Sequence, residues 1–149
     1  MLKIKKTALL ILIALCFTNM QCDEDALVVD VDNSCDEVVI LNKALYGSLV
    51  SDDFNFIDVE IVDDCLNIKI GASGCDGATW ACNLVGSEAI AQSLPEQRNL
   101  KFELVNNEDC DAYFEKTISF NLKPLQISNS VNKVVLHLNG WESSLLYSY

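Results

Sequence analysis

Residues 57–71 read IDVEIVDDCLNIKIG, and their apolar side chains recur at every second position on both sides of the aspartate pair. Ile57, Val59 and Ile61 alternate with acidic residues, and the Leu and Ile residues of 65–71 alternate with Asn and Lys. A side-chain period of two is the period of a β-strand. The stretch therefore predicts two strands, each with one apolar face and one polar face.

The same alternation continues through the rest of the chain. Turn-forming stretches such as GASGCDGA, NNEDCD and SNSVN separate the alternating segments. The pattern predicts an all-β fold, an antiparallel β-sandwich of about seven or eight short strands, with an open barrel as the alternative. The further predicted strands are 37–42, 79–85, 100–105, 117–122, 133–139 and 144–149.

One connection has the features of a short helix, GSEAIAQSL at 86–94. Ser87 is a suitable N-cap, Glu88 would lie in the first turn, and Pro95 follows the end. The prediction is one short helix in a connection, too little to make an α/β fold.

The N-terminus has the features of a secretory signal. Lys3, Lys5 and Lys6 precede the apolar run TALLILIALCF, which is 11 residues long, whereas a membrane-spanning helix needs about 20. We therefore divide the chain into a signal peptide at 1–21, an acidic tether at 22–34 and a sandwich domain at 35–149. In the tether, the stretch ALVVDV is a candidate to join a sheet edge.

The signal ends in TNMQCDEDA at 18–26, which resembles the lipoprotein signals of Bacteroidota, particularly those of flavobacteria. In that group a Gln before the cysteine is tolerated, and an acidic run after it marks export to the surface. The resemblance implies that Cys22 carries the lipid, that Asp23, Glu24 and Asp25 are the export signal, and that the protein is anchored in the outer membrane and exposed at the cell surface. Cys16 is a poorer acyl site because no acidic run follows it.

The charge of the chain excludes one class of partner. The sequence has 10 basic and 22 acidic residues, and removing residues 1–21 removes three basic and no acidic ones, which leaves a formal charge of −15. Phosphate backbones repel such a chain, so we expect no nucleic-acid partner. Contact with the membrane would come through the N-terminal lipid rather than through a basic patch.

Five cysteines remain once Cys16 leaves with the signal and Cys22 takes the lipid. An oxidising compartment favours disulfides, and an odd number leaves one free thiol. Cys82 shares the apolar face of its strand with Trp80 and Leu84, so it is the candidate free thiol. The other four permit three pairings, of which we favour Cys75–Cys110 and Cys35–Cys65. Their spacing, with one histidine in the chain, does not match a zinc site.

No catalytic or cofactor motif is present in the sequence. His137 falls on the polar face of its strand and no nucleophile elbow accompanies it. Acidic residues gather at predicted turns, but the stretch beginning at Asp30 fails the calcium-loop pattern. Trp141 follows Gly140 in a turn and is the candidate ligand-contact residue. We therefore predict no catalytic residues, no metal site and no cofactor.

The mature chain as a whole, over residues 55–149, is similar to a group of small flavobacterial surface lipoproteins with no assigned activity. The similarity rests on CLNIKIGASGCDG, SEAIAQSLPEQRNLKFEL, DCDAYFEKTISFNLKPLQ and VVLHLNGWESSLLYSY, and it implies a location and a β-rich domain. We expect a non-enzymatic protein that binds an unknown protein or glycan ligand or has a structural role in the envelope. The alternatives are a small secreted hydrolase acting on carbohydrate, and an accessory or inhibitor subunit of an envelope complex.

Overall fold

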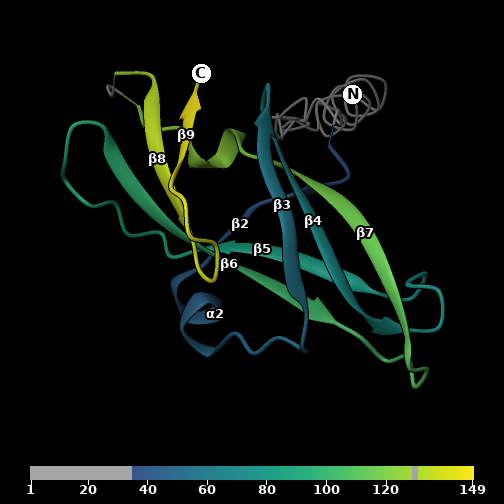
Figure 1. Ribbon diagram of the computed structural model, residues 1–149. Coiled ribbons are helices and arrows are strands. Elements are labelled where there is room, and N and C mark those ends of the chain that lie inside the picture. The colour runs from purple at the N-terminus through teal and green to yellow at the C-terminus, as the bar shows by residue number, and fades with distance from the viewer. Residues whose placement is uncertain (1–34, 129–130) are drawn as a thin grey trace, which may run out of the picture. The chain divides into compact units, whose positions relative to one another are not determined.

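The computed structural model describes residues 35–128 and 131–149, and this part of the chain is all-β (Figure 1). Its nine strands form two sheets that pack face to face, a sandwich-like arrangement. The first sheet has the order β1-β7-β4-β3, with β1 at Glu37–Val38, β7 at Ala112–Asn121, β4 at Cys65–Gly74 and β3 at Asn55–Val62. The second has the order β2-β5-β6-β8-β9, with β2 at Ile40–Leu41, β5 at Ala81–Gly86, β6 at Glu96–Val105, β8 at Lys133–Leu138 and β9 at Leu145–Ser148.

The core lies between the sheets and consists of the alternating apolar residues of both. Each predicted strand of the 57–149 region coincides with an observed one, and each central strand buries the predicted face. Packing of these faces is the main source of stability in such a fold. The buried residues include Leu66, Ile68, Ile70, Leu100, Phe102, Leu104, Ile118, Phe120, Leu122, Val134, Leu136 and Leu138.

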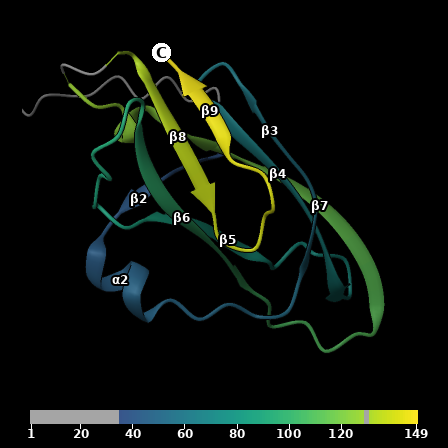
Figure 2. The same ribbon diagram turned by 60° about the vertical axis from the view of Figure 1, so that its left-hand side comes forward.

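The two sheets are mixed rather than purely antiparallel. The predicted strand at 37–42 divides at Val39, so that β1 pairs with β7 in one sheet and β2 pairs with β5 in the other. Both of these pairs are parallel. The pair of β6 and β8 is parallel as well (Figure 2). The N-terminal segment thus passes from the first sheet to the second and connects them along one side of the sandwich.

A β-bulge corrects the predicted faces of β3. The register shifts between Phe56 and Asp58, so Ile57 has no partner on β4 and is exposed, not in the core with Val59. One extra residue reverses the alternation of side chains on either side of it. As a result Phe56 and Val59 both pack on the core, although they are three positions apart in the chain and regular alternation would put them on opposite faces.

The predicted helix at 86–94 is wrong. Glu88 has a φ of 58°, which a helix does not accommodate, and Ala91 pairs with Gln97, so the segment folds back along β6. Residues 88–94 are exposed, so no buried apolar contact stabilises a helix there. The short helix is instead α2 at Lys43–Ser48, where the Asn42 side chain accepts a hydrogen bond from the Leu45 N–H at 2.9 Å. A single 3₁₀ turn, η1, spans Lys123–Leu125.

The predicted signal peptide, Cys22, the acidic run Asp23–Asp25 and the ALVVDV stretch all lie outside the described residues. Among the residues that the structure describes, no helix has the length and apolar character required to cross a membrane.

Candidate functional site

A groove lined by aromatic rings lies where the edge strand of one sheet meets the last hairpin of the other. β3 lies against β9, and the turn between β8 and β9 faces the start of β3. Phe54, Phe56 and Trp141 line the groove, which has a volume of about 520 Å³. A smaller hollow of about 220 Å³ shares Phe54 and Asn139 with it, so the two are adjacent.

The turn that carries Trp141 is held in place by its backbone. The N–H of Asn139 donates to the Leu100 carbonyl at 2.9 Å, and the N–H of Trp141 donates to the Leu138 carbonyl at 3.0 Å. Gly140 between them has a φ of 87°, and a Cβ there would lie 3.3 Å from the Phe56 ring. A glycine therefore suits both the backbone conformation and the close approach of that ring.

The rings of the groove are continuous with the aromatic core. Ring centroids of Phe54 and Phe56 lie 4.9 Å apart, and those of Phe54 and Phe102 lie 5.1 Å apart, in edge-to-face geometry. Trp141 packs on Phe56 at 6.0 Å, while Phe102 packs on the buried Phe120 at 6.0 Å. Such contacts favour fixed ring positions, so the groove is a preformed surface.

The rim of the groove is polar and carries little charge. Asn55, Asn139 and Ser143 supply amide and hydroxyl groups, and Glu142 is the acidic group beside Trp141. Lys101 at the smaller hollow donates to the Tyr46 carbonyl at 2.9 Å, and its ammonium lies 4.7 Å from the centre of the Tyr46 ring. An aromatic floor with a few hydrogen-bonding groups is typical of ligand sites.

A second hollow lies on the opposite side of the sandwich, between the edges of β5 and β7. It has a volume of about 370 Å³ and is lined by Cys82, Trp80 and Lys116 among others. The Lys116 ammonium donates to the carbonyls of Gly77 and Trp80 at 3.1 and 3.3 Å. Desolvation raises the pKa of the Cys82 thiol to about 11, so the group is protonated and unreactive at neutral pH.

The Glu108 carboxylate binds the loop that follows β4. It accepts hydrogen bonds from the N–H groups of Cys75 (2.6 Å), Asp76 (3.2 Å), Gly77 (3.0 Å) and Thr79 (3.2 Å), and from the Thr79 hydroxyl (2.8 Å). Desolvation would raise the pKa of Glu108, but the bonds from Gly77, Thr79 and Cys75 outweigh it and lower that pKa to about 2. Glu108 is one of the acidic residues at the predicted turns, and its carboxylate is therefore engaged in hydrogen bonds within the fold.

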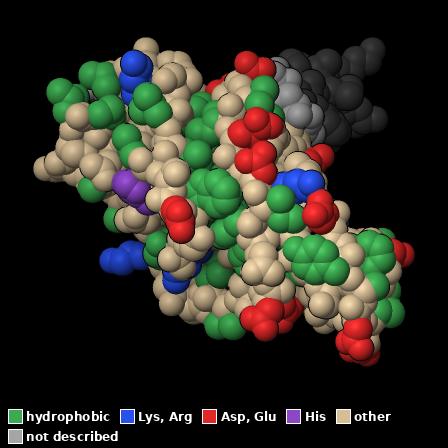
Figure 3. Space-filling view, viewed as in Figure 1, with side chains coloured by type: hydrophobic (Ala, Val, Ile, Leu, Met, Phe, Trp, Pro, Cys, Tyr) green, Lys and Arg blue, Asp and Glu red, His purple; other side chains and the backbone are tan. Residues whose placement is uncertain are grey.

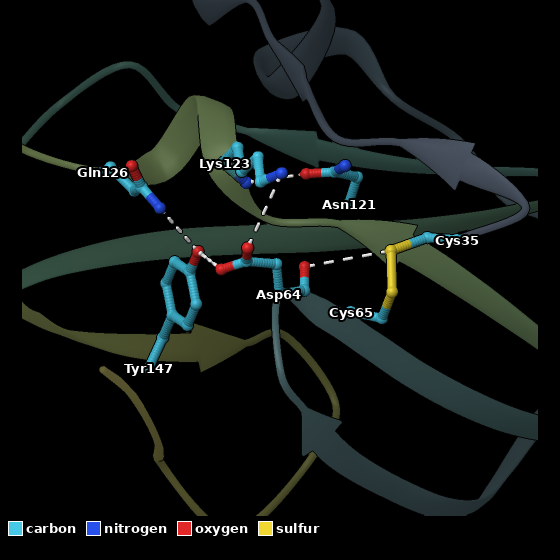
Figure 4. Close-up of polar contacts among 7 residues, drawn as sticks. All are labelled: Cys35, Asp64, Cys65, Asn121, Lys123, Gln126 and Tyr147. Atoms are coloured by element: carbon cyan, nitrogen blue, oxygen red, sulfur yellow. Dashed lines mark hydrogen bonds and ion pairs between the residues drawn. A yellow bond between two sulfur atoms is a disulfide. The ribbon is translucent and has the colours of Figure 1, made fainter. Parts of the chain in front are cut away.

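A polar network links the β3–β4 turn of the first sheet to β9 of the second sheet (Figure 4). The Tyr147 hydroxyl of β9 donates to Asp64 in the β3–β4 turn and accepts a bond from the Gln126 amide at 2.9 Å. The Lys123 ammonium lies 3.8 Å from the same carboxylate. Burial, and then the bond to Asp64, raise the pKa of Tyr147 well above its usual range.

The structure contains the cysteine pairing that we favoured from the sequence. Cys35 is bonded to Cys65 and Cys75 to Cys110, with Cα atoms 5.7 and 4.8 Å apart, and Cys82 is free. Cys82 packs against the core, as its face predicts.

The other predicted residues divide between the groove and the open surface. Trp141 is half-buried in the groove rather than freely exposed. His137 is exposed on the outer face of β8 with its Nε2 2.7 Å from the Gln97 amide oxygen. No described nucleophile or carboxylate contacts it, and in the described ranges no group of three or more His, Cys, Asp or Glu residues is arranged to hold a metal ion.

Sequence reasoning missed Phe54 and Phe56 as partners of Trp141. Their spacing, FNF at 54–56, places two aromatic rings on one face of an extended chain. That signal was present, but its link to residue 141 is a tertiary contact.

Comparison with known proteins supports the fold alone. No protein-family model matches the chain, and no curated protein is similar to it. A NigD-like immunity protein from Bacteroides caccae is similar in structure with a TM-score of 0.54 at 11% identity, over 72% of this chain and 58% of that one. A protein of unknown function, DUF1344, from Bacteroides vulgatus is similar with a TM-score of 0.52 at 20% identity, over 76% of this chain and 56% of that one. The chain thus spans less than two thirds of each neighbour, and both neighbours come from Bacteroides.

Proposed function

We propose that this protein is a lipid-anchored, non-enzymatic binding module of the bacterial envelope, and that its ligand enters the groove of Phe54, Phe56 and Trp141. The observation that carries the proposal is the groove itself: preformed aromatic rings, with amide and hydroxyl groups and one carboxylate, that of Glu142, beside them. A binding module needs such a surface, whereas a hydrolase needs an acid, a base and a nucleophile that converge.

The lining favours an uncharged ligand rich in hydroxyl groups, such as a glycan chain. Aromatic rings pack against the C–H faces of sugar rings, and the amides of Asn55 and Asn139 both donate and accept hydrogen bonds. An anionic glycan is disfavoured because the chain has a strong excess of acidic residues. A protein ligand is the alternative for the same surface.

Replacing Trp141 with Ala tests the groove. In affinity electrophoresis through gels that contain neutral polysaccharides, we expect retardation of the parent protein, and at least about tenfold weaker binding by Trp141→Ala because a central aromatic contact is worth more than about 1.4 kcal/mol. Tyr113→Ala is the matched control, since Tyr113 is an exposed aromatic residue outside the groove. Equal loss in both variants, or no retardation by any neutral polysaccharide, contradicts the glycan ligand.

The anchor is tested at Cys22. We expect Cys22→Ser to abolish labelling by palmitate and to release the protein from membranes, because a thioether lipid on this residue is the proposed attachment. Cys16→Ser is the control and should leave labelling unchanged. Persistent labelling of Cys22→Ser would assign the anchor to another residue.

The accessory or inhibitor role is a second candidate. One structural neighbour is a NigD-like immunity protein, and the end of this molecule opposite the Tyr147 network carries Asp52, Asp53, Asp109 and Asp111 around one hollow. Such an acidic surface would suit a basic partner. Co-purification of a basic envelope protein that is lost in Asp109→Asn/Asp111→Asn, but kept in Trp141→Ala, would favour this role over the groove.

A further inference from the structure

The side of the sandwich that the N-terminal segment crosses is covered only in part. β1 pairs with the last two residues of β7, and β2 pairs with the last two residues of β5. Beside residues 112–118 of β7 and 81–84 of β5 no described strand lies on this side. The second hollow, of about 370 Å³, lies between these two open edges.

The open edge of β7 presents unpaired backbone groups. The N–H of Ser119 points away from β4 and donates to the Asp36 carboxylate at 2.9 Å, and the carbonyl of Asn121 points the same way and accepts from the N-terminal segment at 3.2 Å. Backbone directions alternate along a strand, so the N–H and C=O groups of Thr117 and Glu115 also face this edge. Such an edge is a template for one more strand.

The floor of the second hollow is apolar. Trp80 and Ile118 line it and are buried, and the half-buried Cys82 lies beside them. At the end away from β1, the Lys116 ammonium is held by two backbone carbonyls. A strand added along β7 would place every second side chain over this floor, so the occupant needs apolar residues at alternate positions.

Residues 26–31, ALVVDV, have this pattern and belong to the same chain. Leu27, Val29 and Val31 share one face of an extended chain. The segment lies outside the described residues, but Asp36 lines the second hollow. The five steps from residue 31 to residue 36 span at most about 17 Å. The segment is therefore held within reach of the open edge of β7.

The short connection also decides the direction of the segment. If six residues paired with 112–117 in the antiparallel direction, residue 31 would lie beside residue 112. Asp36 is bonded to Ser119, seven residues and about 23 Å further along the strand, which exceeds the reach of about 17 Å. In the parallel direction residue 31 lies near residue 117. Residues 32–34, DNS, are turn-forming and would then lead to Cys35, which is bonded to Cys65 of β4.

The edge of β3, at the other side of the same sheet, is a poorer place for the segment. The Asp58 carboxylate accepts a hydrogen bond from the Val59 N–H at 3.0 Å, so this edge amide is already capped. Asp58, Glu60 and Asp63 are exposed, and Figure 3 shows acidic side chains gathered over β3 and its turn to β4. Charged residues and a β-bulge protect an edge against an added strand, and the segment itself carries Asp30.

The edge of β7 carries less free negative charge. The Glu115 carboxylate pairs with the Lys69 ammonium at 2.6 Å, and the Asp36 carboxylate is held by two hydrogen bonds. Lys116 adds a cation to the hollow, and Glu37 is an exposed acid beside it. Backbone pairing and apolar burial, rather than charge, would hold the segment here.

We propose that residues 26–31 form a further strand of the first sheet, parallel to β7 along residues 112–117, with Leu27, Val29 and Val31 over the second hollow. This strand extends the cover that β1 and β2 begin. In a chain with a lipid on Cys22, residues 23–25 alone would separate the lipid from the sheet. The inference does not depend on acylation, because the segment pairs with its own domain.

Amide hydrogen exchange tests the pairing. It is read residue by residue by NMR on the full-length chain with Cys22→Ser in detergent micelles. We expect the amides of Thr117 and Glu115 to have protection factors at least about tenfold above that of Ile61, because a paired amide exchanges only when the pair opens. Ile61 is the reference for an open edge, since its N–H points the same way as that of Val59, away from β4.

Two matched variants test the face of the segment. Val29→Asp and Val28→Asp make the same substitution at neighbouring positions that lie on opposite faces, and both positions lie outside the described sandwich. Val29→Asp would bury a carboxylate over the apolar floor, so we expect protection at Thr117 to fall to the level of Ile61 and alkylation of Cys82 by iodoacetamide to become faster. Val28→Asp faces solvent and should leave both unchanged.

The other outcomes contradict the proposal. Protection at Thr117 no higher than at Ile61 in the parent chain means that the edge is open. An equal response to Val28→Asp and Val29→Asp means that the segment has no buried face. Protection at Ile61 in place of Thr117 assigns the segment to β3. Protection that rises with protein concentration assigns it to a second copy of the chain.

Discussion

Glu108 shows how a single acidic side chain can organise a loop. Consecutive N–H groups of residues 75–77 point at one carboxylate, an arrangement that elsewhere binds free anions. Here the anion comes from the chain itself, and the Cys75–Cys110 disulfide joins the same two loops. Glu108 therefore has a structural role, whereas Asp109 and Asp111 nearby are exposed.

The pH dependence of Glu108 follows from its pKa of about 2 in the folded protein, against an ordinary value of 4.5. Because the folded pKa is the lower one, the stabilisation is fully present above about pH 4.5 and is lost as the pH falls toward 2. We expect Glu108→Gln to lower Tm at pH 7 and to flatten the fall of Tm between these two pH values, as measured by thermal melts followed by circular dichroism.

The control for Glu108 is Asp111→Asn, which removes the same charge from the same loop. Asp111 makes no contact with the N–H groups of residues 75–79. If both variants lower Tm and flatten its pH dependence equally, general repulsion rather than the hydrogen bonds of Glu108 explains the effect.

At the scale of the element, the divided N-terminal strand, β1 and β2, has the least strand pairing of any part of the sandwich. β1 and β2 each have two residues, and each pairs with only one neighbour. The Asp36 carboxylate adds a bond from the Ser119 N–H at 2.9 Å and one from the Ser119 hydroxyl at 2.7 Å, which also hold the pKa of Asp36 below its ordinary value. The Cys35–Cys65 disulfide fixes the start of this strand to β4.

We expect Cys35→Ser/Cys65→Ser to destabilise the protein by about 2–4 kcal/mol in denaturant melts, because the bond closes a long loop in the unfolded chain. Amide hydrogen exchange should rise first in residues 36–42. The control is Cys75→Ser/Cys110→Ser, which removes the other disulfide. That disulfide closes a loop of similar length, 35 residues against 30, and its removal should leave residues 36–42 protected. Uniform loss of protection in both variants would contradict a local role.

At the scale of the whole molecule, repulsion among acidic residues opposes the compact state. Residues 35–149 contain 17 acidic and seven basic residues, a formal charge of −10. Raising NaCl from 0.01 to 1 M shortens the Debye length from about 30 to about 3 Å. We expect Tm to rise with salt by a few degrees, about 2–5 °C, as repulsion is screened.

The salt effect is checked with Asp53→Asn/Asp109→Asn/Asp111→Asn, which removes three negative charges from one end of the sandwich. This variant should gain less Tm from salt than the parent does. An identical salt dependence in both would mean that salt acts through the hydrophobic term.

The strands themselves were predictable because alternation is a local property. Each segment from 57 to 149 with a period of two became a strand, since an apolar stripe on one face of an extended chain has to be buried whatever its neighbours are. The free thiol followed from the same reasoning, because the face of Cys82 is set by its position relative to Trp80 and Leu84.

Only the tertiary structure decided which strands lie side by side, and therefore what the site is. Parallel pairing of β6 with β8, the division of one strand at Val39 and the bulge at Ile57 depend on contacts far apart in the chain. The segment at 86–94 has a helical pattern, but it forms no apolar contact that would stabilise a helix, so pairing with Gln97 prevails. Local patterns determine which faces are buried, whereas the groove of Phe54, Phe56 and Trp141 exists only because the packed sheets bring two edge strands together.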